Sequence, residues 1–191
     1  MVLIKGVDYM DFLDGCYVLY DAINRITTPY GGDHYGVDLG WESPLSTNPH
    51  NDIYSAGRGV VVEVVDGLDN DPTSAGTVAS WGNYVKIRHT NGYYSRYAHI
   101  EKGTIPVSVG DEVYASTIVG RIGDSGYSFG AHLHFEVSTG ESSATRIDPT
   151  PYLTNYLTPG EPLFPPTPSG GGKKRFPWFI YFRRRNNGHM F

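Results

Sequence analysis

The stretch Ala131-His-Leu-His-Phe-Glu-Val137 decides the interpretation of this chain. Its strict alternation, with aromatic and β-branched residues among its apolar positions, predicts a β-strand. Residues two apart in a strand share one face, with Cα atoms about 6.6 Å apart. His132, His134 and Glu136 therefore point the same way. The opposite side, which we expect to enter the core, carries Leu133, Phe135 and Val137.

A second stretch, His-Tyr-Gly-Val-Asp at residues 34–38, offers two further metal-binding side chains. A fully extended chain would hold His34 and Asp38 about 13 Å apart, so the chain must bend between them, and Gly36 permits a bend. Imidazole nitrogen and carboxylate oxygen bind zinc at about 2.0 to 2.2 Å, and three protein ligands plus a water are typical of a catalytic site. His34, Asp38 and one histidine of the 131–137 strand supply three ligands, which predicts a catalytic zinc site.

The remaining composition predicts one all-β domain with additional segments. The 191 residues include 24 Gly, 13 Pro and 15 Tyr, with short β-rich runs and little helical periodicity. We expect antiparallel sheets that form a small sandwich or open barrel with a substrate groove, plus irregular N- and C-terminal extensions. Asn91-Gly92 indicates a hairpin, and the only helical piece of the core is expected near residues 149–153. Strands are predicted at residues 60–65, 84–88, 93–98, 112–115, 118–122 and 132–137.

The sequence resembles the lysostaphin-like and LytM-like zinc peptidoglycan endopeptidases, peptidase family M23, over residues 24 to 153. The resemblance rests on the order and spacing of several motifs beyond the two stretches above. These are ITTPYG at 26–31, GNYVKIRH at 82–89, YAH at 97–99, VGDEV at 109–113, GRIG at 120–123, GYSFGAHLHFE at 126–136 and DP at 148–149.

The resemblance implies a role for each matching residue. His34, Asp38 and His134 correspond to the zinc ligands, and His99 and His132 correspond to the catalytic pair beside the metal-bound water. In this chemistry zinc acidifies the water and polarises the scissile carbonyl, while the two imidazoles orient or deprotonate the water and protonate the leaving amine. The sequence does not divide these tasks between His99 and His132.

Two residues near this site have alternative interpretations. Tyr30 is a candidate catalytic residue that would donate a hydrogen bond to the oxyanion, and a packing or turn role is the alternative. Glu136 would accept the free N–H of a ligand imidazole, or it would simply face the edge of the groove. We expect His50, His89 and His189 to lie outside the site.

The chain divides by composition into four segments, which are an N-terminal extension at 1–23, an endopeptidase domain at 24–158, a Pro/Gly-rich linker at 159–172 and a basic aromatic arm at 173–191. Residues 1–23 lack the pattern of a signal peptide. No run approaches the roughly 20 apolar residues of a transmembrane segment. Cys16 is the only cysteine, which excludes an internal disulfide.

One insertion departs from the usual pattern of the family, and a second loop and the C-terminal arm have alternative interpretations of their own. An insertion between Trp41 and Ile53 would wall the groove or form a surface loop, and the acidic loop at 66–76 is expected to be solvated rather than to bind a second cation. The last 22 residues carry a charge of +6 against −11 for the rest. Docking of the arm on a protein partner or on the acidic body is favoured over contact with anionic wall polymer or membrane and over disorder.

These features predict an enzyme that acts outside the cytoplasm on the cell wall, with peptidoglycan as its partner and Zn2+ as its cofactor. The organisation is similar to the tail-tip endopeptidases of bacteriophages, which would place the chain in a virion tail; a longer exported chain is the alternative. A non-catalytic wall-binding or structural tail module of the same fold is the second function class. No sequence-specific binding of nucleic acid is expected. The bond cleaved, by glycyl-glycine or D-alanyl specificity, is not determined by the sequence.

Overall fold

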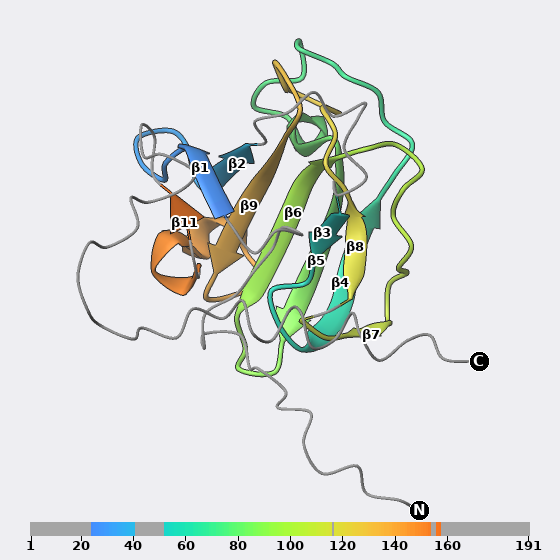
Figure 1. Cartoon of the computed structure of the whole chain (residues 1–191), viewed down its shortest axis with the longest axis vertical. Coiled ribbons are helices and arrows are strands. Elements are labelled where there is room, and N and C mark those ends of the chain that lie inside the picture. Colours follow the sequence, from blue (N-terminus) through green and yellow to red (C-terminus); the bar gives the residue numbers. More distant parts are fainter. Residues whose placement is uncertain (1–23, 41–51, 116, 154–155, 158–191) are drawn as a thin grey trace, which may run out of the picture. The chain divides into compact units, whose positions relative to one another are not determined.

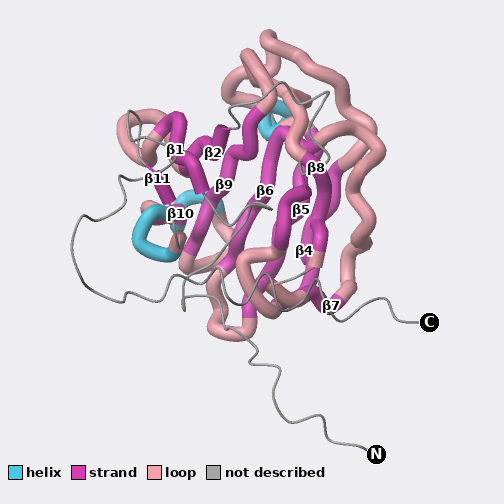
Figure 2. Tube along the Cα trace, viewed as in Figure 1, coloured by secondary structure: helices cyan, strands magenta, loops and turns pink. Residues whose placement is uncertain are grey.

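The computed structural model describes residues 24–40, 52–115, 117–153 and 156–157. Within these ranges the chain forms β-strands and short 3-10 helices, without an α-helix (Figures 1 and 2). The strands are β1 (Asn24–Thr28), β2 (Val37–Gly40), β3 (Asp52–Tyr54), β4 (Gly59–Val65), β5 (Asn83–His89), β6 (Tyr94–Ile100), β7 (Glu112–Val113), β8 (Ile118–Arg121), β9 (His132–Ser138), β10 (Arg146–Ile147) and β11 (Tyr156–Leu157). The 3-10 helices are η2 (Val78–Trp81), η3 (Ser143–Thr145) and η4 (Thr150–Tyr152).

Most of these strands belong to one large sheet. Its order is β11-β1-β2-β9-β6-β5-β4-β7, with β10 paired to β9, and every pairing is antiparallel except that of β1 with β11. The outer strands β11 and β7 do not pair with each other, so the sheet does not close into a barrel. The prediction of an all-β fold with open antiparallel sheets is confirmed.

A second sheet of β3 and β8 covers one face of the large sheet. Its buried side chains Ile53 and Val119 belong to the same hydrophobic cluster as Val85 and Ile87 of β5. Gly120 of β8 lies so close to β6 that a Cβ there would come within 2.7 Å of the Ile100 side chain. The core therefore lies between the two sheets. The opposite face of β9 and β6 does not contribute to this core.

The side chains of strand β9 alternate between the core and the opposite face of the sheet, as the sequence predicts. Leu133, Phe135 and Val137 are fully buried in the core, and the rings of Phe135 and Tyr97 lie 5.3 Å apart. Burying side chains of this size stabilises the fold by roughly 1.5 to 3 kcal/mol each. The alternate residues of β9 face away from this core, where they meet residues of β2 and β6.

The six predicted strands all exist, with bounds that differ by one or two residues. The Asn91-Gly92 turn forms the predicted hairpin between β5 and β6, because the His89 N–H donates to the Tyr93 carbonyl at 2.8 Å and Gly92 adopts φ +86°. The helical piece near residue 150 is the single turn η4. Strands β1, β2, β3, β10 and β11 were not predicted.

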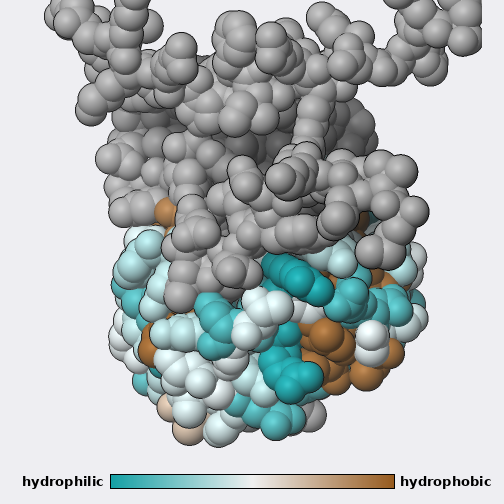
Figure 3. Space-filling model, turned by 90° about the horizontal axis from the view of Figure 1, so that it is seen from below, coloured by the Kyte–Doolittle hydropathy of each residue, from teal (hydrophilic) through white to brown (hydrophobic). Residues whose placement is uncertain are grey.

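Several predictions concern residues outside the described ranges. They include the segments 1–23, 159–172 and 173–191, most of the insertion after Trp41, and the residues Cys16, His50 and His189. In the part of the chain that is described, no helix is long and apolar enough to cross a bilayer. On the face shown in Figure 3 the described surface is mainly hydrophilic, with hydrophobic residues gathered on one side.

Candidate metal centre

Strands β2 and β9 bring the predicted ligands together. The two strands pair antiparallel with Asp38 directly opposite His134, a position at which side chains on one face meet. His34 precedes β2 in a tight turn that is closed by two backbone hydrogen bonds of 3.0 Å between Gly31 and His34. Residues that are about a hundred positions apart in sequence therefore share one small site.

The three side chains form a compact set of donor atoms. Nε2 of His34 lies 3.0 Å from Oδ1 of Asp38 and 3.2 Å from Nδ1 of His134, and that Nδ1 lies 2.9 Å from the same Oδ1. Ligands bound tetrahedrally at about 2.1 Å from zinc are about 3.4 Å apart. The set thus fits a zinc ion after an expansion of a few tenths of an ångström. It is also the one group of this kind among the described residues.

Gly36 has a steric role in addition to the predicted bend. A Cβ on Gly36 would lie 2.8 Å from Nε2 of His134 and 2.7 Å from the Phe135 carbonyl oxygen. Real side-chain carbons do not approach other atoms so closely, so only glycine lets the 34–38 segment lie against the ligand imidazole.

The second nitrogen of each ligand histidine is held by an acceptor. Nδ1 of His34 donates to the Pro29 carbonyl at 3.0 Å, and Nε2 of His134 lies 3.3 Å from Oε1 of Glu136. These contacts fix the ring orientation and direct the other nitrogen toward the site. Glu136 thus contacts the imidazole of His134, as the first of its two interpretations expected.

Glu136 is itself held by three further donors. Oε2 accepts from Arg96 at 2.8 Å, and Oε1 accepts from Arg146 at 2.9 Å and from the Trp81 indole at 3.1 Å. Burial alone would raise the pKa of Glu136, but the hydrogen bond with His134 and the charges of His134, Arg96 and Arg146 lower it to about 2. Glu136 is therefore a fixed negative charge beneath the site.

Asp38 and His134 have strongly shifted pKa values. Burial raises the pKa of Asp38, but hydrogen bonds from His134 and His34 hold it well below its usual range. Burial lowers the pKa of His134, but its hydrogen bonds to Asp38 and Glu136 outweigh this and raise it to about 9. A metal ion must therefore displace a proton from His134, because only the unprotonated nitrogen is a ligand.

His99 and His132 lie beside the three candidate ligands, which is the position expected of these two histidines. Their ring centroids are 4.6 Å apart, and Nε2 of His132 lies 3.5 Å from Oδ1 of Asp38. Each ring donates from Nδ1 to a backbone carbonyl, His132 to Gly130 at 2.7 Å and His99 to Ser125 at 2.8 Å. In the neutral rings Nε2 is consequently the proton acceptor.

His99 has an unusual backbone conformation. Its φ is 60°, the only positive value for a non-glycine residue in the described chain, and such conformations cluster at functional sites. Burial and the neighbouring His132 lower the pKa of His99 to about 4. The ring is therefore neutral near pH 7, with its Nε2 lone pair available.

Two other residues considered in the sequence have contacts of their own. Tyr30 is partly buried against the core, and its hydroxyl lies 3.5 Å from the carbonyl oxygen of Arg146. This contact fits the packing alternative. His89 is buried in the sheet and contacts Arg58 and Ser95, as expected for a histidine outside the site.

The acidic loop at 66–76 uses its carboxylates within the protein. Asp66 accepts from the backbone of Gly67 and Gly103, and Asp69 pairs with Lys102. The described residues hold no second group of potential metal ligands there. That this loop is solvated and binds no second cation stays a prediction.

Sequence reasoning missed the residues that support the site. Arg96, Arg146 and Trp81 meet at Glu136, and the Arg96 guanidinium stacks 3.8 Å from the Trp81 ring centroid. They come from three different elements, η2, β6 and β10. The only feature of the sequence that could have indicated them is the alternation in β6, which places Arg96 on the same face as Ala98. That alternation does not identify the residue that Arg96 contacts.

Comparison with known proteins identifies the class to which this fold and donor set belong. The profile of Peptidase family M23 matches residues 32–149. The chain belongs to this family, as its motifs predict. It is therefore a member of a metallopeptidase family, and its His-Asp-His set fits the zinc ion of that family.

Individual relatives agree with this assignment. The chain is 33% identical over 125 residues to glycyl-glycine endopeptidase ALE-1 of Staphylococcus capitis, covering 64% of this chain and 30% of the relative. It is 30% identical over 115 residues to peptidoglycan DD-endopeptidase ShyA of Vibrio cholerae, covering 60% and 21%. A zinc-containing peptidase from Vibrio cholerae superposes with a TM-score of 0.54 at 25% identity, covering 72% of this chain and 39% of that one. The chain thus spans less than a third of the length of these two curated relatives.

Proposed function

We propose that this chain is a zinc-dependent endopeptidase that hydrolyses peptide bonds in bacterial peptidoglycan. In this proposal His34, Asp38 and His134 hold the zinc, and His99 and His132 are the catalytic residues. The observation that carries it is the meeting of three ligand atoms within 3.2 Å of one another, beside two imidazoles whose Nε2 atoms are free to accept protons.

The protein's own groups would perform the proton transfers. Bound zinc would supply Lewis acidity toward the scissile carbonyl and toward a water. Nε2 of His132 or His99 would accept a proton from the attacking water, since Nδ1 of each ring is committed to a carbonyl. The same nitrogen would then return the proton to the leaving amine. The low pKa of His99 keeps this ring unprotonated at the start of the cycle.

The names of the relatives support peptidoglycan as the substrate but include two different bonds, glycyl-glycine in one and a DD bond in the other. We therefore propose peptidoglycan as the substrate and leave both bonds as candidates. Mass spectrometry of the fragments released from walls with each type of cross-bridge identifies the bond.

We also propose that the domain at 24–158 acts outside the cytoplasm on the cell wall, and that the basic arm at 173–191 docks on a protein partner. The charge of +6 on the last 22 residues, against −11 for the rest, supports docking on an acidic surface. Delivery as part of a phage virion tail or as part of a longer exported chain would both bring the domain to its substrate.

The test measures zinc content and new amino termini released from purified walls. Wild type is expected to hold one zinc per chain and to release amino termini. His132→Ala is expected to keep the zinc but lose the release, and His134→Ala is expected to lose both. Circular dichroism checks that both variants fold. Zinc binding without release from walls of several bridge chemistries would favour the non-catalytic module instead.

A further inference from the structure

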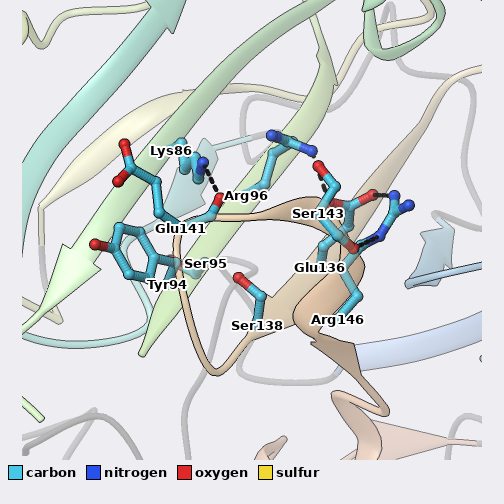
Figure 4. Close-up of a pocket in the computed structure, with 9 residues that line it drawn as sticks. All are labelled: Lys86, Tyr94, Ser95, Arg96, Glu136, Ser138, Glu141, Ser143 and Arg146. Carbon is cyan, nitrogen blue, oxygen red and sulfur yellow. Dashed lines mark hydrogen bonds and ion pairs between the residues drawn. The ribbon is translucent and has the colours of Figure 1, made fainter. Parts of the chain in front are cut away.

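The metal centre is supported in two different ways. Below the ligand His134, the carboxylate of Glu136 is held by ion pairs with Arg96 and Arg146, and these charges are matched within the protein (Figure 4). The two histidines that are not ligands depend instead on backbone carbonyls of one loop, residues 124–130, which precedes β9.

This 124–130 loop supplies the acceptor for both rings. Nδ1 of His99 donates to the Ser125 carbonyl at 2.8 Å, and Nδ1 of His132 donates to the Gly130 carbonyl at 2.7 Å. The hydrogen bond at one ring nitrogen determines which nitrogen carries the proton. The position of the loop therefore decides whether Nε2 of each ring can accept a proton.

The part of the loop at Ser125 is anchored in the core. The buried Ser125 hydroxyl accepts from the Asn83 N–H at 2.9 Å and donates to the Ile100 carbonyl at 2.8 Å. The next residue, Gly126, packs against Gly82 so closely that a Cβ would not fit between them. The carbonyl that holds His99 is thus fixed by contacts of its own.

The part of the loop at Gly130 depends on Ser128 and on a side chain from elsewhere. The hydroxyl of the buried Ser128 donates at 2.9 Å to the Gly130 carbonyl, which also accepts from His132. The Ser128 carbonyl accepts in turn from Nδ2 of Asn70 at 2.9 Å, and the same Nδ2 donates to the Asp124 carbonyl at 2.7 Å. One amide group therefore ties the two ends of the loop together.

Asn70 belongs to the acidic loop at 66–76, whose backbone also pairs with the 124–130 loop. The Asp71 N–H donates to the Gly126 carbonyl at 2.7 Å, and the Gly126 N–H donates to the Asp69 carbonyl at 3.0 Å. This backbone pairing brings the side chain of Asn70 to the two carbonyls that it bridges. A carboxylate could not replace the amide, because it offers only acceptors.

We propose that Asn70 is a positioning residue, which orients His132 for catalysis through Ser128 and Gly130. The inference rests on the proposed function, since it assigns the acidic loop a role in the same site. Without Asn70 the Gly130 carbonyl is no longer held in place, and His132 loses the partner that keeps its proton on Nδ1.

His99 provides an internal reference for this proposal. Its acceptor, the Ser125 carbonyl, is anchored without the help of Asn70. Loss of Asn70 should therefore affect the orientation of His132 and leave that of His99 unchanged. A general loosening of the site would affect both rings.

The test uses two variants of Asn70 and one control. Asn70→Ala removes both hydrogen bonds, and Asn70→Asp keeps the shape of the side chain but sets a carboxylate against two carbonyls. Asn70 is exposed, so both variants should fold, which circular dichroism checks. Asp69→Asn is the matched control, because it changes the neighbouring side chain, which is 82% exposed and pairs with Lys102.

The first measurement is the imidazole ¹⁵N NMR spectrum of the zinc-loaded full chain, which reports the tautomer of each histidine. Wild type and Asp69→Asn should hold the proton on Nδ1 in both His99 and His132. Both Asn70 variants should show a mixture of tautomers at His132 alone, with the zinc content unchanged. An unchanged His132, or an equal change in both rings, would overturn the proposal.

The second measurement is the rate of cleavage of wall peptides. One hydrogen bond shifts a conformational equilibrium by roughly two- to tenfold, so the loss of two from Asn70 should lower kcat about tenfold with little change in KM. Asp69→Asn should keep the wild-type kcat. An unchanged kcat in the Asn70 variants would contradict the positioning role. If wild type cleaves no peptide, the endopeptidase proposal fails, while the tautomer of His132 still tests whether Asn70 orients this ring.

Discussion

The buried histidine His89 gives this fold a pH-dependent stability that is separate from the metal site. Its Nδ1 donates to the carbonyl of Arg58 at 3.1 Å, so in the neutral ring Nε2 accepts from the Ser95 hydroxyl at 2.8 Å. Burial lowers the pKa of His89 to about 4, although the Arg58 contact partly opposes this. The unfolded chain has the ordinary value of about 6.5.

The sign follows from which state binds the proton. Between pH 6.5 and pH 4 the unfolded chain protonates His89 while the folded chain does not, so lowering the pH favours unfolding. The contribution is fully present above pH 6.5, falls as the pH drops toward 4 and is constant below that. At about 1.4 kcal/mol per pKa unit, the free energy of unfolding should lose roughly 3 kcal/mol across this window.

Urea unfolding of wild type and His89→Gln at pH 7, 6, 5 and 4 isolates this contribution. Glutamine offers polar atoms at similar positions but does not titrate in this range. The advantage of wild type over the variant should shrink by roughly 3 kcal/mol between pH 7 and pH 4. Both proteins are measured with a chelator, so that other groups titrate equally in each. A difference that stays constant with pH would refute the assignment of the shift to His89.

Three further predictions concern the metal centre. Gly36→Ala should lose zinc and activity, because its methyl group would displace the His134 ring; zinc analysis of the folded variant checks this, and retained zinc contradicts it. Glu136→Gln should weaken zinc binding about 10- to 100-fold, because it removes the acceptor that orients His134; competition with a chromophoric chelator measures the change. Chelation of wild type should lower the Tm, and added zinc should restore it in a concentration-dependent way; a Tm that ignores zinc would argue against the His34–Asp38–His134 set.

Much of the fold and of the donor set was predictable because strong local patterns encode them. The alternation around His132 and His134 defined both the strand and its two faces, and Asn91-Gly92 marked a hairpin. The pairing of His34 and Asp38 with a histidine a hundred residues away came from spacing and from family resemblance. The structure explains it by the register that sets Asp38 opposite His134.

The unpredicted features depend on contacts that no single segment encodes. Strands such as β10 and β11 have two residues each and exist because a longer neighbour offers hydrogen bonds. The meeting of Trp81, Arg96 and Arg146 at Glu136 requires the sheet order to be known first. The need for glycine at position 36 likewise follows only from its close approach to the His134 ring in the folded chain.

The two faces of β9 have a consequence for engineering new specificities. Phe135 anchors the interior and lies between His134 and Glu136 in the chain, so a change of its volume would tilt both neighbours at once. Random substitution along this strand should therefore yield mostly inactive proteins. Variation in the turn after β9, which holds Glu141 and Ser143, would change the neighbouring surface while the strand stays in place.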